Sequence, residues 1–489
     1  MNIQVLKSHI ILNTGYGEHA YNFTIAIANH GLEVLVVDDT PGKIHNLNIP
    51  GIRVIPEMYR SIPVIYICFH HNLYAIPDKQ LAVIYTMMET DRLHPKWAEK
   101  VNKADSVWVP SRFNIDTFLD SGIHREKLSL VRAPIQVDTI EGKPFPFQTR
   151  KSFKFLSIFN RVIWYRKGVD VLMKAYLNAF TSEDDVCLIL KTDMTREELL
   201  RIAGISDNPK LPEIEIIRTF LDENGMLSLY RGVNAYILPA RGEGIGRPYL
   251  YAMSHELPVI ATNWSGNTEF MNHDNSYLVN YELKDIPNEF EKIIYPLNFG
   301  AKYAEPDIDD LIRIMKYVPE NSEENLRKGK RAKKEILTNH TYGAVAGQVI
   351  NALRKLKPTA TSSQRRLKPR DVFINMYPLY FPGKSTEEVK NLDIEFSKRP
   401  VKKIAIYGTG EGAKLAYQWL TRFDQIEKIV FIDRNKEKTR FMKRSVIHYE
   451  ELKTNDADLI LIGAAAVFIS PILENLKKTT QVPVYFFGA

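Results

Sequence analysis

Two cations in the middle of the chain are spaced so that they could bind a diphosphate. Arg161 follows an apolar run, and Lys167 comes six positions later, directly before Gly168 and an amphipathic stretch. At the carboxyl edge of a parallel sheet, the planar fork of an arginine and the point charge of a lysine can converge on one diphosphate. The alternative for this segment is a basic loop in solvent.

A glycine-rich loop, ARGEGIGRP, which we call the Glu243 loop, follows another apolar run and leads into a predicted helix. It contains Glu243, and it places the backbone N–H groups of a helix start at the same edge of the sheet. Such N–H groups attract negatively charged ligands. The loop therefore adds backbone donors and one carboxylate to the region of the two cations.

Two glycine patterns of the form GxGxxA have the setting of phosphate-binding turns. The first contains Gly15 and Gly17, and the second contains Gly408 and Gly410. Each lies between an apolar strand and a predicted helix, and the next strand after the second pattern ends at Asp433. Small residues let the backbone approach a phosphate or a ribose, but they also serve close packing of a helix on a strand. The patterns alone leave an NAD-dependent oxidoreductase open.

The elements that position these residues alternate apolar runs with amphipathic stretches, which is typical of a parallel sheet covered by helices. This predicts an α/β fold with two facing Rossmann-like lobes at residues 1–150 and 151–356 and a small Rossmann-like module at 400–489. Residues 357–399 contain a basic, proline-containing linker and a segment without a clear period. Near the end of the second lobe we expect helices around 307–317 and 321–356.

Composition excludes several classes of protein. The chain has 489 residues, of which 45% are hydrophobic, so it is neither disordered nor fibrous. No apolar run approaches the ~20 residues of a membrane span, and the first residues do not form a secretion signal, so we expect a cytoplasmic protein. Its two cysteines, Cys68 and Cys187, lie in apolar runs, which excludes a disulfide framework. The net charge of +7 would suit an anionic ligand or a membrane surface.

Several motifs occur in the order in which retaining GT-B-fold glycosyltransferases of family 4 carry them. They include the RKG segment, VCLILK, ARGEGIGRP and PVIATNWSGNTEF, and the resemblance covers roughly residues 1–350. It implies two Rossmann-like lobes that face each other, with a nucleotide-sugar donor mainly on the second and an acceptor mainly on the first. It also implies a reaction that needs no metal or other cofactor.

The resemblance implies a role for each matching residue. Arg161 and Lys167 would bind the diphosphate of the donor, Glu243 would hold hydroxyls of the donor sugar, and Gly15 and Gly17 would close over the phosphates. The Glu243 loop would add donor contacts from Gly244, Ile245, Gly246 and Arg247.

Tyr251 departs from the E-x7-E motif of the family, which has a second glutamate at this position to hold the nucleotide ribose. Three outcomes stay open: one hydrogen bond from the phenol holds the ribose, the ribose site has changed, or the protein no longer turns over. The last would make it a catalytically impaired binding or scaffold protein on a glycosyltransferase fold.

Acceptor contacts are expected from the first lobe. Glu89 follows a predicted strand and could hold an acceptor hydroxyl or cap the next turn. His70 and His71 end another strand and could line the acceptor site or be a packed pair. The acceptor itself would be a glycan, a lipid-linked sugar or a protein. Peripheral membrane association and a homo-oligomer stay open, and no nucleic-acid partner is expected.

Two further motifs contain residues that could bind a metal ion or a nucleotide. Asp307 to Asp310 resemble a metal-binding DxD motif, but they directly follow a proline and open an amphipathic helix, so a helix cap explains them better. No metal site is expected. In the module at 400–489, Gly408, Gly410 and Asp433 could bind a nucleotide.

Overall fold

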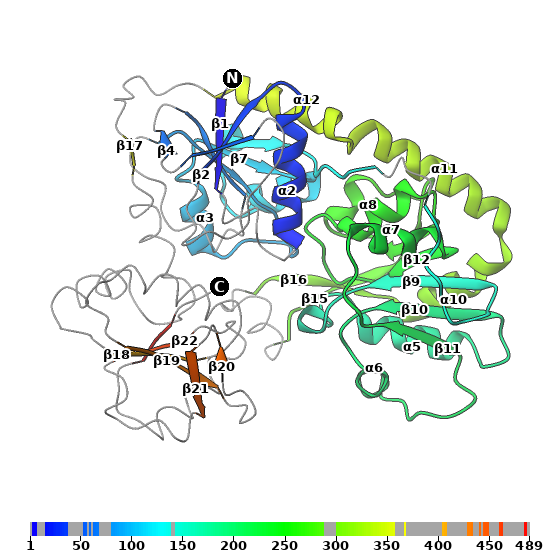
Figure 1. The fold of residues 1–489 in the computed structure, drawn as a ribbon. Helices are drawn as coiled ribbons and strands as arrows, with labels where there is room; N and C mark the ends of the chain where they lie inside the picture. Colours follow the sequence, from blue (N-terminus) through cyan, green and yellow to red (C-terminus); the bar gives the residue numbers. More distant parts are fainter. Residues whose placement is uncertain are drawn as a thin grey trace. The chain divides into compact units, whose positions relative to one another are not determined.

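The computed structural model of the protein divides into two compact units. The larger is formed by residues 1–37, 49–53 and 59–365, and the smaller by residues 38–48, 54–58 and 366–489. The structure describes residues 2–6, 15–37, 52–55, 58–59, 62–67, 80–137, 142–287, 300–356, 366–367, 403–407, 428–433, 440–441, 444–448, 459–462 and 484–486. The larger unit contains both predicted lobes, except for residues 38–48 and 54–58 of the first (Figure 1).

The first lobe is built on a 7-stranded sheet with the order β3-β2-β1-β5-β6-β7-β8. Every pair from β2 to β8 is parallel. Strands β5, β6 and β7 are buried at every position, which explains their continuous apolar sequences. The strands are β1 (Asn2–Leu6), β2 (Glu33–Val37), β3 (Ile52–Ile55), β5 (Val64–Ile67), β6 (Ala82–Tyr85), β7 (Ser106–Val109) and β8 (Leu128–Leu130).

The helices of the first lobe begin where polar residues can cap them. Ser111 accepts a hydrogen bond from the backbone N–H of Asn114 and so caps the next helix, and His94 caps another in the same way. They are α2 (Gly15–Ala28), α3 (Pro95–Val101), α4 (Arg112–Asp120) and the 3-10 turn η2 (Arg125–Lys127).

The second lobe contains a 6-stranded parallel sheet with the order β11-β10-β9-β12-β13-β14. Its strands are β9 (Phe153–Ile158), β10 (Val186–Lys191), β11 (Glu213–Ile217), β12 (Ala235–Leu238), β13 (Val259–Thr262) and β14 (Tyr277–Val279). Its helices are η3 (Arg161–Ile163), α5 (Val169–Ala179), α6 (Arg196–Ala203), α7 (Glu223–Arg231), α8 (Arg247–Ser254), η4 (Gly266–Glu269), α10 (Ile308–Glu320) and α11 (Ser322–Asn339). The predicted pair of Rossmann-like lobes is thereby confirmed.

The acidic cluster at Asp307 caps a helix, as predicted. Its carboxylate accepts hydrogen bonds from the backbone N–H groups of Asp309 and Asp310, at 2.9 and 3.1 Å, and so begins α10. Within the part of the chain that the structure describes, no cluster of His, Cys, Asp and Glu could hold a metal ion.

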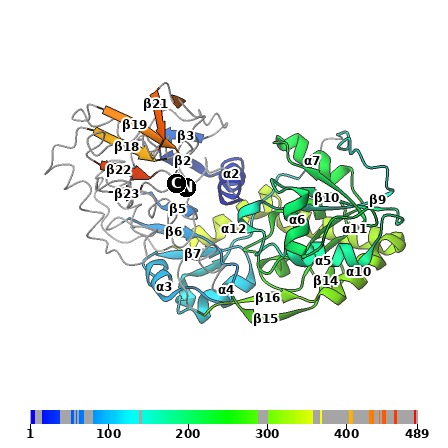
Figure 2. The same cartoon turned by 90° about the horizontal axis from the view of Figure 1, so that it is seen from below.

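The single helix expected around 321–356 is two helices, which corrects the prediction. The first, α11, ends at Asn339, and Thr341 accepts a hydrogen bond from the N–H of Ala344 to begin α12 (Tyr342–Arg354). The break carries the chain back to the first lobe, where the hydroxyl of Tyr342 donates to the side chain of Asn22 in α2. Figures 1 and 2 both show α12 beside α2, with α11 over the second lobe.

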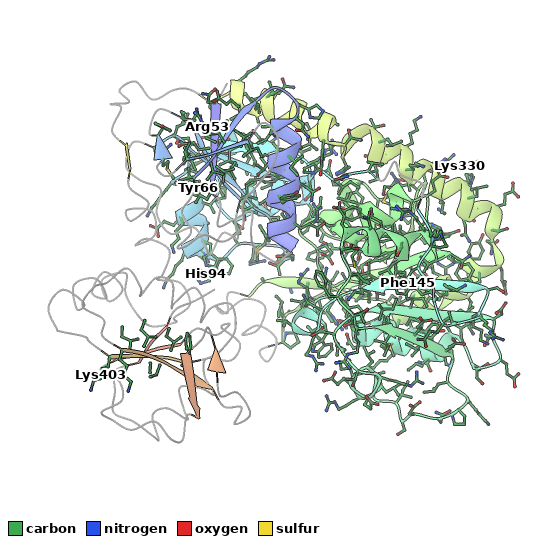
Figure 3. The ribbon with its side chains drawn as sticks, viewed as in Figure 1. Arg53, Tyr66, His94, Phe145, Lys330 and Lys403 are labelled. Atoms are coloured by element: carbon green, nitrogen blue, oxygen red, sulfur yellow. The ribbon has the colours of Figure 1, made fainter. Side chains whose placement is uncertain are left out.

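The chain crosses between the lobes at two places that touch each other. The backbone N–H of Ile135 donates to the carbonyl of His340 at 2.9 Å, and the ring of His340 lies 2.9 Å from the carbonyl of Ala133. After the first crossing, the N–H of Phe145 donates to the carbonyl of Ser228, so that this segment is attached to the second lobe (Figure 3). The two crossings therefore lie next to each other.

An antiparallel hairpin in the second lobe was not predicted. It consists of β15 (Tyr281–Asp285) and β16 (Lys302–Pro306). The backbone of Lys302 exchanges hydrogen bonds with Asp91, at 2.7 Å to its carboxylate and 3.3 Å from its N–H. The hairpin therefore bridges to the first lobe beside the segment that contains Glu89.

The smaller unit contains a 6-stranded sheet with the order β20-β21-β19-β18-β22-β23. Every pair of neighbouring strands is parallel except β20 and β21, as is typical of a Rossmann-like module. The strands are β18 (Lys403–Tyr407), β19 (Lys428–Asp433), β20 (Arg440–Phe441), β21 (Arg444–His448), β22 (Leu459–Ile462) and β23 (Val484–Phe486), and a separate pair is β4 (Met58–Tyr59) with β17 (Arg366–Leu367).

Candidate functional site

Lys167 is held at the start of α5 by a turn that only glycine can make. Gly168 has a φ of +64°, and a Cβ atom there would lie 1.9 Å from the carbonyl oxygen of Pro239. This close approach places Lys167 at the carboxyl edge of the sheet, where it is only 8% exposed. Its ammonium group makes an ion pair with the carboxylate of Glu243.

Glu243 lies in the Glu243 loop after β12, and both its backbone N–H and its backbone carbonyl are hydrogen-bonded. Its N–H donates to the hydroxyl of Ser265 at 2.9 Å, and its carbonyl accepts from the N–H of Gly266 at 2.9 Å. Burial by itself would raise the pKa of Glu243, but the charges of Lys167 and Arg166 outweigh burial and hold that pKa below its usual range. Glu243 is therefore a buried carboxylate that stays ionised.

Arg166 completes this cluster, and the sequence prediction did not include it. Its guanidinium donates to the carbonyl of Gly242 at 2.7 Å and to the carboxylate of Glu243 at 3.4 Å. On its other side it lies 4.0 Å from the carboxylate of Glu89 in the first lobe. Burial lowers the pKa of Lys167, and Glu243 offsets only part of that effect. The only signal for Arg166 in the sequence was its place next to Lys167.

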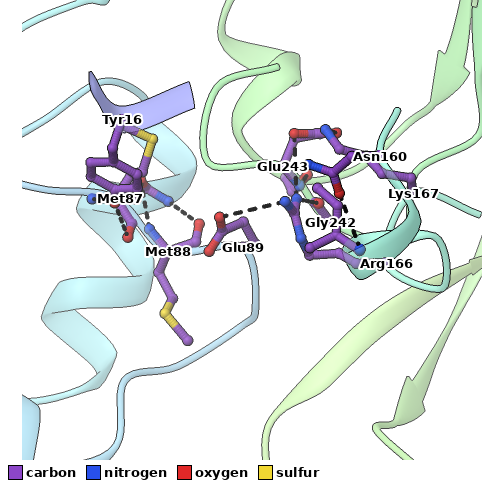
Figure 4. A network of polar contacts seen from close by, with 12 residues as sticks. Tyr16, Met87, Met88, Glu89, Asn160, Arg166, Lys167, Gly242 and Glu243 are labelled. Atoms are coloured by element: carbon purple, nitrogen blue, oxygen red, sulfur yellow. Dashed lines mark hydrogen bonds and ion pairs between the residues drawn. The ribbon is translucent and has the colours of Figure 1, made fainter. Parts of the chain in front are cut away.

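The segment of the first lobe that contains Met87 and Glu89 lies directly against the Glu243 loop (Figure 4). A Cβ atom on Gly242 would lie 2.0 Å from the carbonyl oxygen of Glu89, and one on Gly244 would lie 2.4 Å from the side chain of Met87. The backbone of Met87 is in turn fixed by the hydroxyl of Tyr16 in α2, at 3.2 Å. The cavity bounded by Glu89, Arg166, Gly242 and Tyr303 has a volume of about 10 Å³. Such a cavity holds about one water molecule, so the two lobes are in close contact at this point.

Arg161 has different partners from Lys167. Its guanidinium pairs with the carboxylate of Glu198 and donates to the carbonyl of Asp193 at 3.0 Å, and its side chain is 43% exposed. The hydrogen bond that Arg161 donates to the carboxylate of Glu198 raises the pKa of Arg161. The structure thus brings Lys167 to Glu243 but does not join Arg161 to that pair.

Tyr251 and Arg247 meet a carboxylate from the other lobe. The hydroxyl of Tyr251 donates to Glu18 at 3.0 Å, and the guanidinium of Arg247 donates to the same oxygen of Glu18 at 2.9 Å. Arg247 also donates to the carbonyl of Pro134 in the first crossing, at 3.2 Å. Glu18 was not among the predicted site residues, although it stands inside the first glycine pattern.

The remaining donor-side residues lie at two helix starts. Gly15 and Gly17 are in the first turn of α2, where backbone N–H groups have no acceptor within the helix itself. Gly246 has a φ of +79° and is the N-cap of α8, and Ile245 before it is 4% exposed. Both helix starts therefore flank the contact between the lobes.

Several predicted residues lie outside the described residues. These are His70, His71, Gly408 and Gly410. Asp433 is the last residue of β19, which pairs in parallel with β18, so the order of strand, glycine pattern and acid-ended strand is present. Cys187 is buried in β10, as expected for a core residue. Among the described helices, none is both long enough and apolar enough to span a bilayer.

Comparisons with known proteins match the two units to different families. Residues 154–297 match the family model of the glycosyl transferases group 1, and residues 401–483 match the model described as C2185-like, N-terminal. A comparison with curated proteins gives no significant match.

Solved structures share the two-lobe fold. The chain is similar to sucrose-phosphate synthase from Thermosynechococcus elongatus, with a TM-score of 0.52 and 13% identity over 73% of this chain and 99% of that one. It is also similar to Alr3699/HepE of Anabaena in complex with UDP, with a TM-score of 0.53 and 13% identity over 73% of this chain and 100% of that one. A match to TarM of S. aureus, with a TM-score of 0.44 and 14% identity, covers 60% of this chain and 55% of TarM, so the chain spans about half the length of that protein.

The family match supports one of the enzyme classes that the sequence left open. Lys167 and Glu243 both lie within the matched residues 154–297, whereas β16, α10 and α11 of the second lobe lie beyond them. Residues 154–297 therefore match a glycosyl transferases group 1 domain, and the chain has the two-lobe fold of these solved structures.

Proposed function

We propose that the protein transfers a sugar from a nucleotide-diphosphate donor to a hydroxyl of a glycan, a lipid-linked sugar or a protein, with retention and without a metal. The observation that carries this proposal is the buried cluster of Lys167, Arg166 and Glu243 at the edge of the second sheet. Two cations and one carboxylate in a dry site match a ligand that has a diphosphate at one end and sugar hydroxyls at the other.

In this proposal the carboxylate of Glu243 occupies the place of the donor until the donor binds. The incoming diphosphate takes over Lys167 and Arg166, and Glu243 is then able to accept hydrogen bonds from hydroxyls of the donor sugar. Arg161, which is exposed near the same edge, would exchange Glu198 for a phosphate oxygen. The cations and the start of α8 would stabilise the charge that develops on the departing diphosphate.

Retention would follow from the side on which the acceptor approaches. If an acceptor hydroxyl attacks from the face that the diphosphate leaves, the leaving phosphate itself can take the proton, and no protein nucleophile is required. Glu89 lies on the first lobe, within reach of Arg166, and is the residue that we propose to orient the acceptor hydroxyl. A donor can enter only if the lobes separate, because Met87 lies against Gly244 in the closed arrangement.

Uridine nucleotides are the first donors to test, because the similar structure of Alr3699/HepE is a complex with UDP. We place the protein in the cytoplasm, where its net charge of +7 would suit peripheral association with an anionic membrane surface.

The test is to incubate the purified chain with UDP-, GDP- and ADP-sugars and to measure release of the nucleoside diphosphate, with and without EDTA. We expect slow release that EDTA does not abolish, because Lys167 and Arg166 supply the positive charge. Loss of release in EDTA that Mg²⁺ or Mn²⁺ restores would contradict the metal-free reaction. Nucleotide binding without any release, together with no transfer, would instead favour the impaired binding protein that Tyr251 left open.

A further inference from the structure

A polar cluster joins the starts of two helices from opposite lobes. Glu18 is in the first turn of α2, Arg247 is the first residue of α8, and Tyr251 stands one turn later in α8. One oxygen of Glu18 accepts hydrogen bonds from both Arg247 and Tyr251, at 2.9 and 3.0 Å. The phenol of Tyr251 also accepts from Arg247 at 3.1 Å. The three side chains therefore fix one another, and only Glu18 comes from the first lobe.

Arg247 of this cluster, and His19 next to Glu18 in the chain, have hydrogen-bonding capacity that the described protein does not use. The Nε atom of Arg247 and both ring nitrogens of His19 are buried and have no hydrogen-bond partner among the described residues. The side chain of Arg247 is 7% exposed, and His19 is 1% exposed. Buried polar groups without partners are costly and rare in native proteins, so this combination indicates a place where a polar ligand supplies the missing partners.

The state of each group defines which ligand would fit. Burial, and then the charge of Arg247, lowers the pKa of His19 to about 3, so its ring is neutral near pH 7 and offers one donor and one acceptor. Burial raises the pKa of Glu18, but Arg247 outweighs burial and keeps that carboxyl ionised. The second oxygen of Glu18 accepts from no described residue, and the side chain of Glu18 is 49% exposed. An ionised carboxylate next to a phenol suits two neighbouring hydroxyl groups.

The cluster is attached to the loop that contains Glu243. Arg247 follows Glu243 by four residues, and four residues of chain span at most about 14 Å. A ligand whose diphosphate lies between Lys167 and Arg166 could therefore present the group on the other side of its diphosphate to the Glu18 cluster. In a nucleotide-sugar donor that group is the ribose, which carries a pair of neighbouring hydroxyls.

We propose that Glu18, reaching across from the first lobe, is the carboxylate that binds the ribose hydroxyls of the donor nucleotide, and that Tyr251 and Arg247 orient it. This inference rests on the proposed function. It gives Tyr251 a role that differs from a direct replacement of a glutamate: the phenol holds a carboxylate that comes from the other lobe. As a result, the ribose contacts both lobes, and its binding stabilises their closure.

The experiment compares nucleoside diphosphates with and without the ribose 2′-hydroxyl. Dissociation constants are measured by calorimetry for UDP, GDP and ADP and for their 2′-deoxy forms. For the base that binds best, we expect the unchanged chain to bind the 2′-deoxy form about tenfold more weakly. In Glu18→Gln this ratio should fall below about threefold, because a neutral amide is a weaker acceptor for a hydroxyl. Glu323→Gln changes an exposed carboxylate in the first turn of α11 and should keep the tenfold ratio.

A structural role of Glu18 alone would give a different result. If Glu18 only joined the lobes, Glu18→Gln would lower the melting temperature but leave the ratio between ribo and deoxy forms unchanged, and that result would overturn the assignment. If Glu18→Gln fails to fold, Tyr251→Phe replaces it, since it keeps the ring and removes the hydroxyl that orients Glu18. A ratio in Tyr251→Phe equal to that of the unchanged chain would also contradict the proposal. If the unchanged chain binds no nucleoside diphosphate, the proposed function fails, and this assignment fails with it.

Discussion

Lys167 and Glu243 are two buried charges that depend on each other. In Lys167→Ala, Glu243 would keep only Arg166 at 3.4 Å, and a bound diphosphate would lose one charge-assisted partner worth roughly 2 to 4 kcal/mol. We therefore expect kcat/KM for donor hydrolysis to fall by a factor on the order of one hundred. Lys174→Ala, on an exposed position of the same helix α5, is the matched control and should leave hydrolysis unchanged.

A rate for Lys167→Ala within about threefold of the unchanged chain would remove Lys167 from the site. The unfolding temperature has to be measured beside the rate, because loss of one partner of a buried ion pair also destabilises the fold. A folded variant that has lost hydrolysis supports the role of Lys167 in binding the donor.

Two buried histidines make the stability of the protein sensitive to acid. Burial lowers the pKa of His19 to about 3 and that of His340 to about 4, whereas the unfolded chain takes up these protons near 6.5. Between pH 6.5 and these values the unfolded state binds more protons, so stability falls as the pH falls, by about 1.4 kcal/mol per pH unit for each histidine.

We expect the melting temperature of the unchanged chain to drop between pH 7.5 and pH 5.5. His19→Phe removes one of the two titrating rings and keeps an aromatic ring against Tyr85, whose centroid lies 4.7 Å away. The drop should therefore be smaller in His19→Phe. An equal drop in both proteins would show that His19 takes up no extra proton on unfolding in this range.

Single residues could be predicted where a local pattern defines them. Lys167 and Glu243 stand next to glycines in motifs from which we predicted parts of a donor site, and in the structure their side chains form an ion pair. The pairing of Arg161 could not be predicted, because the spacing of six residues does not define which way each side chain points. In the structure Arg161 turns toward Glu198, and the neighbouring Arg166 takes the place next to Glu243.

At the scale of the elements, the turn between η3 and α5 positions Lys167. Gly168 and Gly204 both have left-handed backbone angles, with φ of +64° and +73°. A Cβ atom on Gly204 meets nothing within 4 Å, so Gly204→Ala carries only the backbone strain of about 1 to 2 kcal/mol. On Gly168 the Cβ atom would also collide with the carbonyl of Pro239.

We therefore expect Gly168→Ala to lower the melting temperature at least twice as much as Gly204→Ala. It should also reduce donor hydrolysis, because Lys167 is the neighbouring residue, while Gly204→Ala should not. Thermal unfolding and hydrolysis rates of the two purified variants provide the measurement. Equal drops in melting temperature would mean that the chain at Pro239 moves aside without cost.

The strands were predictable because burial on both faces requires continuous apolar sequence, as in β5, β6 and β7. The hairpin of β15 and β16 was not, since β15 is exposed at all five positions and its sequence YELKD has only two apolar side chains, Tyr281 and Leu283, which are too few to mark a strand. The break between α11 and α12 also went unpredicted. His340 and Thr341 end one helix and begin the next through contacts at Ala133 and Ala344, and the first of these is distant in sequence.

At the scale of the whole molecule, the larger unit depends on contacts between residues far apart in the sequence. Glu269 of the second lobe accepts from the backbone and side chain of Arg112 in the first lobe and also pairs with Arg132. Arg247 and Glu18 are separated by 229 positions. No local pattern indicates such pairs, so the sequence could predict the two lobes but not the residues that close them on each other.

The division into two units predicts where donor chemistry is located. Lys167, Arg166, Glu243 and Glu18 all belong to the larger unit, which ends at residue 365, whereas the C2185-like match lies in the smaller unit at residues 401–483. A chain that ends near residue 356 keeps every residue of the proposed donor site. We expect it to hydrolyse the donor at a rate within about threefold of the full chain.

The smaller unit would then contribute to the acceptor, to self-association or to binding of a second ligand through its glycine pattern. The measurement compares the truncated and full chains in two assays, donor hydrolysis and transfer to a glycan or lipid-linked acceptor. Hydrolysis should survive truncation, because Lys167 and Glu243 lie in the second lobe and Glu18 in the first. Transfer should fall if the smaller unit recruits the acceptor. The smaller unit also includes residues 38–48 and 54–58, so the melting temperature of the truncated chain must show that the first lobe is folded. A folded truncated chain that had lost donor hydrolysis would place part of the catalytic machinery beyond residue 356, and the division of labour between the units would be wrong.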